Sequence, residues 1–283
     1  MTRPPRGGAD PAARSAERAV DLALAEVERR YGLGRSLAAP GWVRARVLTI
    51  LNGAAVRDGV SPLVAAERLQ EDRQAIEEIV GALRVGETRF YRDPITWEAI
   101  ASSILPRLPP DLPIAGLSAG CSTGEEAYTL GMVLASAGRR FSVLGVDRSV
   151  PAIEAAREAV YSAEAAEQLP PALAQRYCEL KGGALHICQE LRDVVSFEVC
   201  DLVHAVPTGG FQIIFFKNVL LYLAEPAGDA VARRLAAELD PGGLLFPAAS
   251  EAPRLCGAGL TPVRVNAQVI AFRGPGNERT GFP

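Results

Sequence analysis

The chain has 283 residues, 48% of them hydrophobic, and a formal net charge of −3. This length and composition can bury a sizeable core, and they predict two domains or one large domain with an extension. No apolar run approaches the roughly 20 residues that span a bilayer, and the N-terminal segment MTRPPRGGADPAARSAE lacks the apolar stretch of a signal peptide. We therefore expect a cytoplasmic protein that is not inserted in a membrane.

Cysteine and histidine usage restricts the chemistry. The five cysteines are scattered and include no C-x-x-C pair, which indicates buried thiols in a reducing compartment rather than disulfides or a zinc site. Only two histidines are present, His186 and His204. A histidine-based triad or a multi-histidine metal centre is therefore disfavoured, and we expect no bound metal.

Charge is spread unevenly along the chain. Residues 1–92 hold 15 Arg and 12 acidic residues, whereas the remainder is net acidic. An arginine-bearing front half is compatible with docking on an acidic partner. A solvated helical surface with ordinary charge scatter explains so small a difference more simply, and we expect no nucleic-acid partner.

The first third of the chain predicts an all-helical domain over residues 17–85, preceded by a disordered tail over residues 1–16 that is rich in Pro, Gly, Ala and Arg. Apolar residues at helical spacing predict three helices. They cover residues 17–30, residues 41–57 and a stretch opened by Ser61 as N-cap and Pro62 as first helical residue. This domain shows no catalytic set.

Residues 86–112 are predicted to form a linker that contains the motif GETRFYRDP and a short helix near residues 95–104. Strands and helices then alternate over residues 113–273, and residues 274–283 form a loose polar tail. The predicted strands are 113–117, 141–146, 194–199, 211–216, 244–248 and 265–272, and the predicted helices are 125–136, 153–160 and 230–239. A small hairpin over residues 177–188 is expected to be inserted into the sheet.

A turn of small residues follows the first strand, within the sequence LSAGCSTGEEAYTLGM. A strand, a turn containing Gly120 and Gly124, and a helix form the first unit of a nucleotide-binding α/β sheet. The turn is neither G-x-G-x-x-G nor a phosphate loop. Glu125 and Glu126 open the helix, which disfavours a polyphosphate and suits a neutral or cationic ligand. An acidic first turn that merely complements the helix dipole explains them equally well.

An acidic residue also follows the second strand. Asp147 lies about 20 residues beyond the glycine turn, where folds of this kind bind a ribose hydroxyl. It would also suit the role of cap for the next helix, and the two roles do not exclude each other.

Six motifs occur in one order behind the helical domain: GETRFYRDP, LSAGCSTGEEAYTLGM, GVDRS, CDL, FFKNVLLYL and PGGLLFPAASE. Together they resemble the CheR family of chemotaxis receptor methyltransferases, from about Gly41 to Phe272. The resemblance implies an α/β, Rossmann-like S-adenosylmethionine-dependent methyltransferase sheet with a small β-hairpin insertion, preceded by a small all-α N-terminal domain. It implies methyl transfer to glutamate side chains of chemoreceptors, with S-adenosylhomocysteine as the product. The implied partner is the cytoplasmic helical domain of a receptor, and the enzyme is expected to be a monomer.

The resemblance also assigns roles to individual residues. Arg92 and Tyr222 are the catalytic candidates, with Arg92 orienting the substrate carboxylate and Tyr222 lying near the methyl group. A salt bridge to Asp93 or Glu87 is the alternative for Arg92, and a core position is the alternative for Tyr222. The implied cofactor-binding residues are Thr88 and Arg92 at the active site, Ala119, Gly120 and Glu125 for the methionine part, Asp147 for the ribose, Asp201 and Leu202 for the adenine, and Asn218 and Val219 after the fourth strand.

The implied reaction needs little acid–base machinery, since a glutamate carboxylate is ionised at neutral pH and is already nucleophilic. It requires in-line placement and partial desolvation. The sequence departs from the usual family pattern at Gly86, Lys217, Asp201 and residues 248–251. The hairpin is short, so we do not expect it to dock a receptor tail peptide.

Two alternatives to receptor methylation stay open. One is a related methyltransferase that acts on another protein or on a small molecule. The other is a non-catalytic regulator that retains the fold for cofactor binding. The presence of Arg92, Asp147 and Tyr222 favours the two enzyme interpretations.

Overall fold

The computed structural model describes residues 11–38, 40–83 and 88–274. The chain divides into two compact units. A helical unit comprises Met1–Val85 together with Tyr222–Glu225, and an α/β unit comprises Gly86–Leu221 and Pro226–Pro283. Among the described residues, every helix is too short or too polar to cross a membrane.

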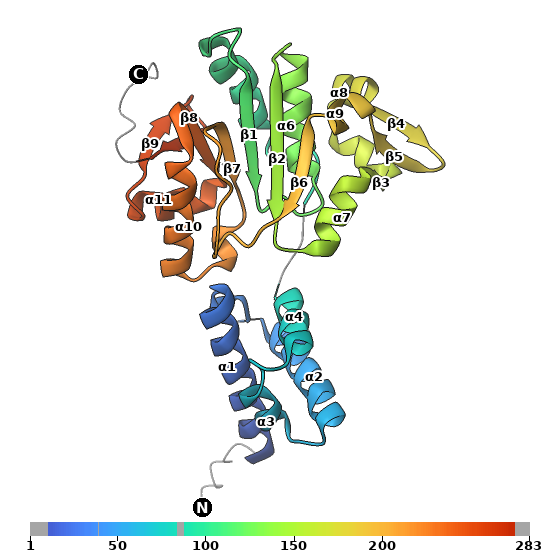
Figure 1. The fold of residues 1–283 in the computed structure, drawn as a ribbon, viewed down its shortest axis with the longest axis vertical. Helices are drawn as coiled ribbons and strands as arrows, with labels where there is room; N and C mark the ends of the chain where they lie inside the picture. Colours follow the sequence, from blue (N-terminus) through green and yellow to red (C-terminus); the bar gives the residue numbers. More distant parts are fainter. Residues whose placement is uncertain (1–10, 39, 84–87, 275–283) are drawn as a thin grey trace, which may run out of the picture. The chain divides into compact units, whose positions relative to one another are not determined.

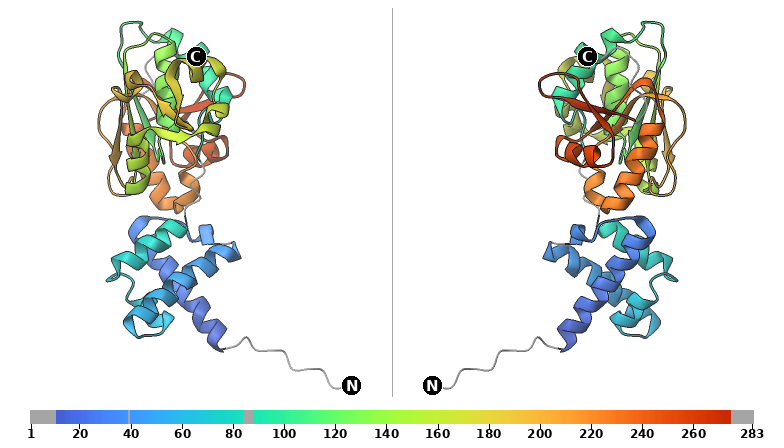
Figure 2. Two further views of the ribbon diagram at one scale, coloured as in Figure 1. Left: turned by 90° about the vertical axis from the view of Figure 1, so that its right-hand side faces the viewer. Right: turned by 90° about the vertical axis from the view of Figure 1, so that its left-hand side faces the viewer.

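Four α-helices lie in the described part of the helical unit, and α1 and α2 cross each other in both views of Figure 2. They are α1 (Pro11–Tyr31), α2 (Gly41–Asp58), α3 (Pro62–Glu67) and α4 (Arg73–Ala82). The predicted cap of α3 is confirmed, because the Ser61 hydroxyl accepts a hydrogen bond from the Val64 N–H at 3.3 Å. Buried apolar residues such as Val20, Val47 and Leu51 form the core of this unit.

Two predictions for this region are wrong. Residues 11–16 were expected in a disordered tail, but α1 begins at Pro11, because alanine and arginine favour helix and proline fits the first turn. The predicted third helix is two helices, since Asp72 accepts a hydrogen bond from the Ala75 N–H and starts α4. The predicted disorder of residues 1–10, the C-terminal tail beyond residue 274, and Gly86 and Glu87 lie outside the described residues.

The α/β unit is built on a seven-stranded sheet, shown in Figure 1 with α6 (Glu125–Ser136) beside β1 and β2. In spatial order its strands are β6 (Val195–Val199), β2 (Phe141–Asp147), β1 (Ile114–Ala119), β7 (Phe211–Phe216), β8 (Leu239–Pro247), β10 (Ile270–Arg273) and β9 (Thr261–Arg264). The first five are parallel, and β10 is antiparallel to both of its neighbours. Every residue of β7 is buried, as expected for a strand covered on both faces.

The far end of the sheet differs from the prediction. The strand expected over residues 265–272 is wrong in its first half. Residues 265–269 form the turn between β9 and β10, because the Asn266 side chain accepts hydrogen bonds from the N–H groups of Gln268 and Val269. Strand β8 begins at Leu239, earlier than expected. Its pairing with β7 shifts register between Phe211 and Ile213, and this irregularity accommodates the Pro-Gly-Gly segment.

The predicted hairpin is present as β4 (Cys178–Lys181) and β5 (Ala184–Ile187). It is not inserted into the main sheet, however. Strand β5 also pairs with β3 (Val160–Ser162), a strand that the sequence did not reveal, and the three form a separate antiparallel sheet.

The remaining helices of the α/β unit surround these two sheets (Figure 1). They are α5 (Pro94–Ala99), α7 (Val150–Glu158), α8 (Pro171–Tyr177), α9 (Gln189–Arg192), α10 (Glu225–Ala237) and α11 (Ala252–Gly257). A linker was expected over residues 86–112, but the described residues 88–112 do not form one. They belong to the α/β unit, where Trp97 of α5 is buried and stacks on Phe215 with ring centroids 4.6 Å apart.

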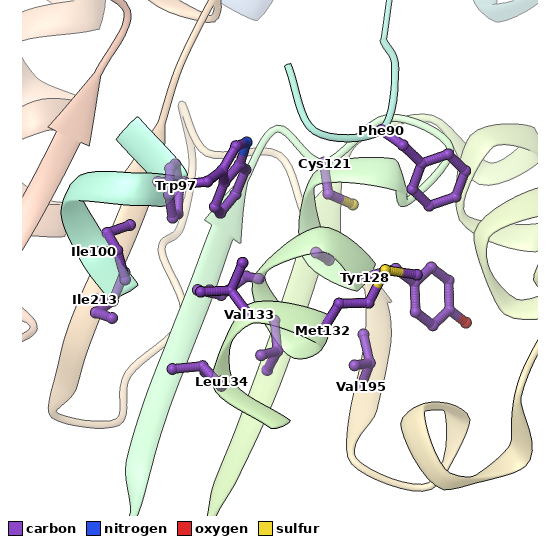
Figure 3. Packing of buried hydrophobic residues seen from close by; sticks show 14 of the residues in the cluster. Phe90, Trp97, Ile100, Cys121, Tyr128, Met132, Val133, Leu134, Val195 and Ile213 are labelled. Atoms are coloured by element: carbon purple, nitrogen blue, oxygen red, sulfur yellow. The ribbon is translucent and has the colours of Figure 1, made fainter. Parts of the chain in front are cut away.

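Buried residues of α5, α6 and the main sheet form one hydrophobic cluster, which supports the elements that carry the site described below. Figure 3 shows part of it, with Trp97 and Ile100 on one side of α6 and Tyr128 on the other. All five cysteines are free thiols, as expected, but only Cys121 is buried and Cys256 is exposed.

Candidate active site

The order of the strands marks one place where a ligand would bind. Strand β1 lies between β2 and β7. After β1 the chain continues outwards through β2 to β6 on one side, then returns to β7 and continues outwards to β8 on the other side. Open α/β sheets bind ligands at the carboxyl ends of the strands flanking such a reversal. The loops that follow β1 and β7 meet there, because a Cβ atom added to Gly120 would overlap the Val219 side chain.

The glycine turn after β1 is held by backbone hydrogen bonds. Gly120 has a φ of 86°, and its N–H and that of Cys121 both donate to the Val146 carbonyl, at 2.8 and 2.9 Å. The Tyr161 hydroxyl donates to the Thr123 carbonyl at 2.8 Å. The turn is thus fixed to β2 and to the small sheet before any ligand binds.

Asp147 lies at the carboxyl end of β2 and is 5% exposed. One carboxylate oxygen accepts the Ser122 N–H at 3.1 Å, and the other accepts the Ser149 N–H at 2.9 Å. The cap of α7 is Ser149, whose hydroxyl accepts the Ala152 N–H, so the capping alternative for Asp147 is wrong. Asp147 instead joins the glycine turn to the loop after β2.

Glu125 is a buried carboxylate at the start of α6. It accepts a hydrogen bond from the Thr123 hydroxyl at 2.7 Å and another from the Thr88 side chain. Burial raises the pKa of Glu125, and these hydroxyl groups oppose that effect. Two segments far apart in the sequence therefore meet at one desolvated anion, which a cationic ligand would stabilise.

Arg92 lies in a strained turn. Tyr91 and Asp93 on either side of it have φ values of 50° and 63°, in the left-handed region. The Trp97 indole donates to the Arg92 carbonyl at 2.8 Å, and Lys217 Nζ donates to Asp93 Oδ2 at 2.7 Å.

A second carboxylate in the first turn of α6 lies close to these charges. Glu126 accepts the Ser118 hydroxyl at 2.7 Å. Burial raises the pKa of Glu126, while the positive charges of Lys217 and Arg92 favour its ionised form.

The loop after β6 places Asp201 near the strand end that carries Asp147. The Cys200 N–H donates to the Asp147 carbonyl at 3.0 Å, and Asp201 forms an ion pair with Arg148 at 3.7 Å. Leu202 is buried, and its carbonyl accepts a hydrogen bond from Arg234 at 2.8 Å.

The loop after β7 is held by one buried carboxylate. Asn218 has a φ of 59°. Glu251 accepts the N–H groups of Asn218, Leu221 and Ala248 at 2.8, 3.2 and 3.2 Å. These bonds fix the backbone that places Val219 against Gly120.

Residues 86–254 match the model of a known family, described as the SAM-binding domain of the CheR methyltransferases, where SAM is S-adenosylmethionine. The chain belongs to the CheR methyltransferase family. The resemblance found in the sequence is thereby confirmed, as is the α/β methyltransferase fold.

Curated relatives are about 30% identical to this chain over the residues that align. A chemotaxis protein methyltransferase 2 of Pseudomonas aeruginosa is 31% identical over 64% of this chain and 69% of its own length. A chemotaxis protein methyltransferase 1 of the same organism is 30% identical over 71% of this chain and 80% of its own. A probable biofilm formation methyltransferase WspC of Pseudomonas putida is 31% identical over 72% of this chain, which spans half of that relative's length.

The CheR-family site residues suit S-adenosylmethionine. The buried carboxylate of Glu125 would stabilise the cofactor's positive charge. No group of three or more His, Cys, Asp or Glu side chains arranged to hold a metal occurs among the residues described.

Most of the predicted site residues meet in the α/β unit. Contacts join Thr88 to Glu125, Gly120 to Val219, and the loop of Asp201 to Asp147. Tyr222 instead belongs to the helical unit, where its carbonyl accepts the Gly34 N–H at 2.8 Å. Its catalytic role stays a prediction.

The sequence interpretation missed the charged residues that support this site. Lys217 and Glu251 carry no predicted role. Asp93 was considered only as an alternative ion-pair partner of Arg92, and Glu126 only as part of an acidic first turn, yet all four make the contacts described above. One local signal was available for Lys217, because a charged residue directly after six buried residues of a strand must find a partner.

Proposed function

We propose that this CheR-family protein transfers the methyl group of S-adenosylmethionine to glutamate side chains of chemotaxis receptors and forms methyl esters. The observation that carries the proposal is the meeting of Thr88, Glu125 and the Gly120 turn at the carboxyl end of β1. Relatives named chemotaxis protein methyltransferases support the substrate class.

The residues of the chain position two reactants. Glu125 is proposed to bind the cationic amino-acid end of the cofactor, Asp147 the ribose, Asp201 and Leu202 the adenine. Ala119, Asn218 and Val219 complete its surroundings. When bound, the cofactor supplies an electrophilic methyl group on a sulfonium that leaves as a neutral thioether.

Arg92 is proposed to hydrogen bond one oxygen of the substrate carboxylate and aim the other at the methyl carbon. The carboxylate oxygen forms the new bond to that carbon while the carbon–sulfur bond breaks, and the electron pair of that bond stays on sulfur. No proton moves, because a glutamate is ionised at neutral pH. Tyr222 is proposed to assist near the methyl group.

We expect the enzyme to act as a cytoplasmic monomer on the helical domain of a receptor, without a metal.

The test incubates the protein with methyl-labelled S-adenosylmethionine and receptor cytoplasmic fragments, then measures labelled methanol released by mild alkali. Alkali-labile label on the receptor is expected. Arg92→Ala should abolish transfer while calorimetry still shows S-adenosylhomocysteine binding. Arg89→Ala is the matched control, because this nearby arginine is exposed and has no assigned role. Normal turnover of Arg92→Ala would remove Arg92 from the mechanism.

A second candidate is methylation of a protein outside chemotaxis, which the relative named as a probable biofilm formation methyltransferase favours. Cofactor binding without receptor labelling would point to such an acceptor. If neither binding nor labelling occurs, the non-catalytic interpretation replaces both enzyme candidates.

A further inference from the structure

Lys217 is a buried cation at the end of a buried strand. The chain contains only two lysines, Lys181 and Lys217. Lys181 is exposed at the end of β4, whereas the Lys217 side chain is only 5% exposed. Burying an ammonium group is unfavourable unless opposite charges and hydrogen bonds compensate it, so the surroundings of Lys217 indicate what it does.

The alternation of side chains along β7 explains where Lys217 points. Phe215 stacks on Trp97 of α5, and Lys217, two positions later, lies on the same face of the sheet. Its ammonium group is 2.7 Å from Asp93 Oδ2 and 5.7 Å from the centre of the Phe215 ring. Its charge also stabilises ionised Glu126 of α6. One side chain thus joins the end of β7 to the start of α5, and its charge acts on α6.

Asp93 belongs to what we call the Arg92 turn, residues Tyr91–Asp93. Both outer residues of this turn have left-handed backbones, which persist in residues other than glycine only where surrounding contacts fix them. The Tyr91 N–H donates to the Thr129 hydroxyl at 3.1 Å, and the Trp97 indole donates to the Arg92 carbonyl. Asp93 itself accepts hydrogen bonds from Thr96, at 2.7 Å, and from Lys217. The hydrogen bond from Lys217 to Asp93 connects this turn to the end of β7, beside the proposed site.

We infer that Lys217 is a positioning residue, which acts through Asp93 and Glu126 to hold the Arg92 turn in the conformation that aims Arg92 at the substrate carboxylate. The inference rests on the proposed function for the role of Arg92. It does not require Lys217 to touch either reactant. Replacing the ammonium with an uncharged group of similar length should leave Asp93 without its cation and should loosen the turn.

The first test does not depend on activity. Hydrogen–deuterium exchange of the peptide covering residues 88–99 is compared in wild type, Lys217→Met, Lys217→Arg and Lys181→Met. Faster exchange in Lys217→Met alone is expected, since only this variant removes the buried cation. Unchanged exchange would overturn the inference. If Lys217→Met does not fold, Asp93→Asn removes the same ion pair, and asparagine tolerates the left-handed backbone.

The second test separates positioning from cofactor binding. Lys217→Met should lower kcat about 10- to 100-fold, because a misplacement of about 1 Å costs that much. The S-adenosylhomocysteine Kd should stay within about twofold, as for an independent site. Lys217→Arg should restore activity. In a protein that already carries Arg92→Lys, Lys217→Met should lower kcat only a little further. Additive losses, or an affinity loss as large as the kcat loss, would overturn the inference. If wild type methylates no receptor, the proposed function fails and the exchange experiment still decides this inference.

Discussion

Gly120 shows how one residue sets the space available at the strand ends. Its φ of 86° disfavours any side chain, and a Cβ atom there would overlap Val219. Gly138 is a matched comparison, because it has a φ of 66° and a Cβ atom added there would meet no other atom within 4 Å. Close approach of two loops, as well as backbone conformation, therefore requires glycine at residue 120.

Gly120→Ala is expected to destabilise the protein by about 2–4 kcal/mol, which combines backbone strain with overpacking against Val219. Gly138→Ala is expected to cost about 1 kcal/mol, from strain alone. Urea unfolding measures both values. Adding Val219→Ala to Gly120→Ala should recover part of the loss. Equal costs for the two glycine variants would show that the loops do not constrain each other.

Replacing Asp147 tests its proposed role in binding the ribose of the cofactor. Asp147→Ala should weaken S-adenosylhomocysteine binding by about 10- to 100-fold, the effect of losing a hydrogen bond to a charged group. Calorimetry measures the affinity, and a thermal melt confirms that the variant is folded. Asp193→Ala, which replaces an exposed aspartate, is the control. Unchanged affinity in folded Asp147→Ala would refute the ribose assignment and leave Asp147 as a support for the glycine turn.

The residue before helix α5, Asp93, has a charge whose ionisation is linked to stability. Burial alone would raise the pKa of Asp93, but hydrogen bonds from Lys217 and Thr96 hold it below its usual value. The pKa of Asp93 is lower in the folded state than in the unfolded state. Ionised Asp93 therefore stabilises the fold at pH values above its unfolded-state pKa of about 3.9. That contribution is lost as the pH falls through the folded value.

Wild type and Asp93→Asn should therefore differ in stability at neutral pH and converge in acid. Urea unfolding from pH 6 down to pH 3 would show the difference shrinking as the pH passes below about 4. A difference that stays constant over this range would mean that Asp93 is not stabilised by charge. Because 39% of the Asp93 side chain is exposed, solvent weakens the effect and only its direction is predicted.

Elements with a local signal could be predicted from the sequence. The cap at Ser61, the apolar strand β7 and the β4–β5 hairpin each carry such a signal in a few neighbouring residues. The break between α3 and α4 could not be predicted in this way, because the apolar stripe continues across it. Strand β3 is three residues long and is recognised only by its pairing with β5.

The site was predictable as far as it depends on family motifs. The contact between Asp93 and Lys217 spans 124 residues and follows from the packing of α5 on β7, where Trp97 stacks on Phe215, and no local pattern contains this packing. Glu251 is similar, because its role depends on the loop after β7 lying beside the end of β8. Motif residues can therefore be assigned from sequence, whereas the charged residues that hold them can be found only from the tertiary structure.

The chain as a whole passes three times between its two units. Residues Tyr222–Glu225 follow β7 but belong to the helical unit, where Leu33 and Leu223 form an isolated β-bridge. The Ala224 N–H donates to the Gly32 carbonyl at 2.7 Å. The helical unit thus includes a segment that comes directly after the proposed site in the sequence, although each unit has its own buried core.

Separate cores predict separate responses to core mutations. Leu51 of α2 and Leu130 of α6 are both fully buried, and replacing either with alanine should cost about 2–5 kcal/mol. In calorimetry, Leu51→Ala should lower only the transition of the helical unit, and Leu130→Ala only that of the α/β unit. Leu51→Ala should also keep its S-adenosylhomocysteine affinity within about twofold, as expected for a residue in the core of the other unit. A single transition lowered equally by both substitutions would show instead that residues 222–225 couple the two units into one cooperative structure.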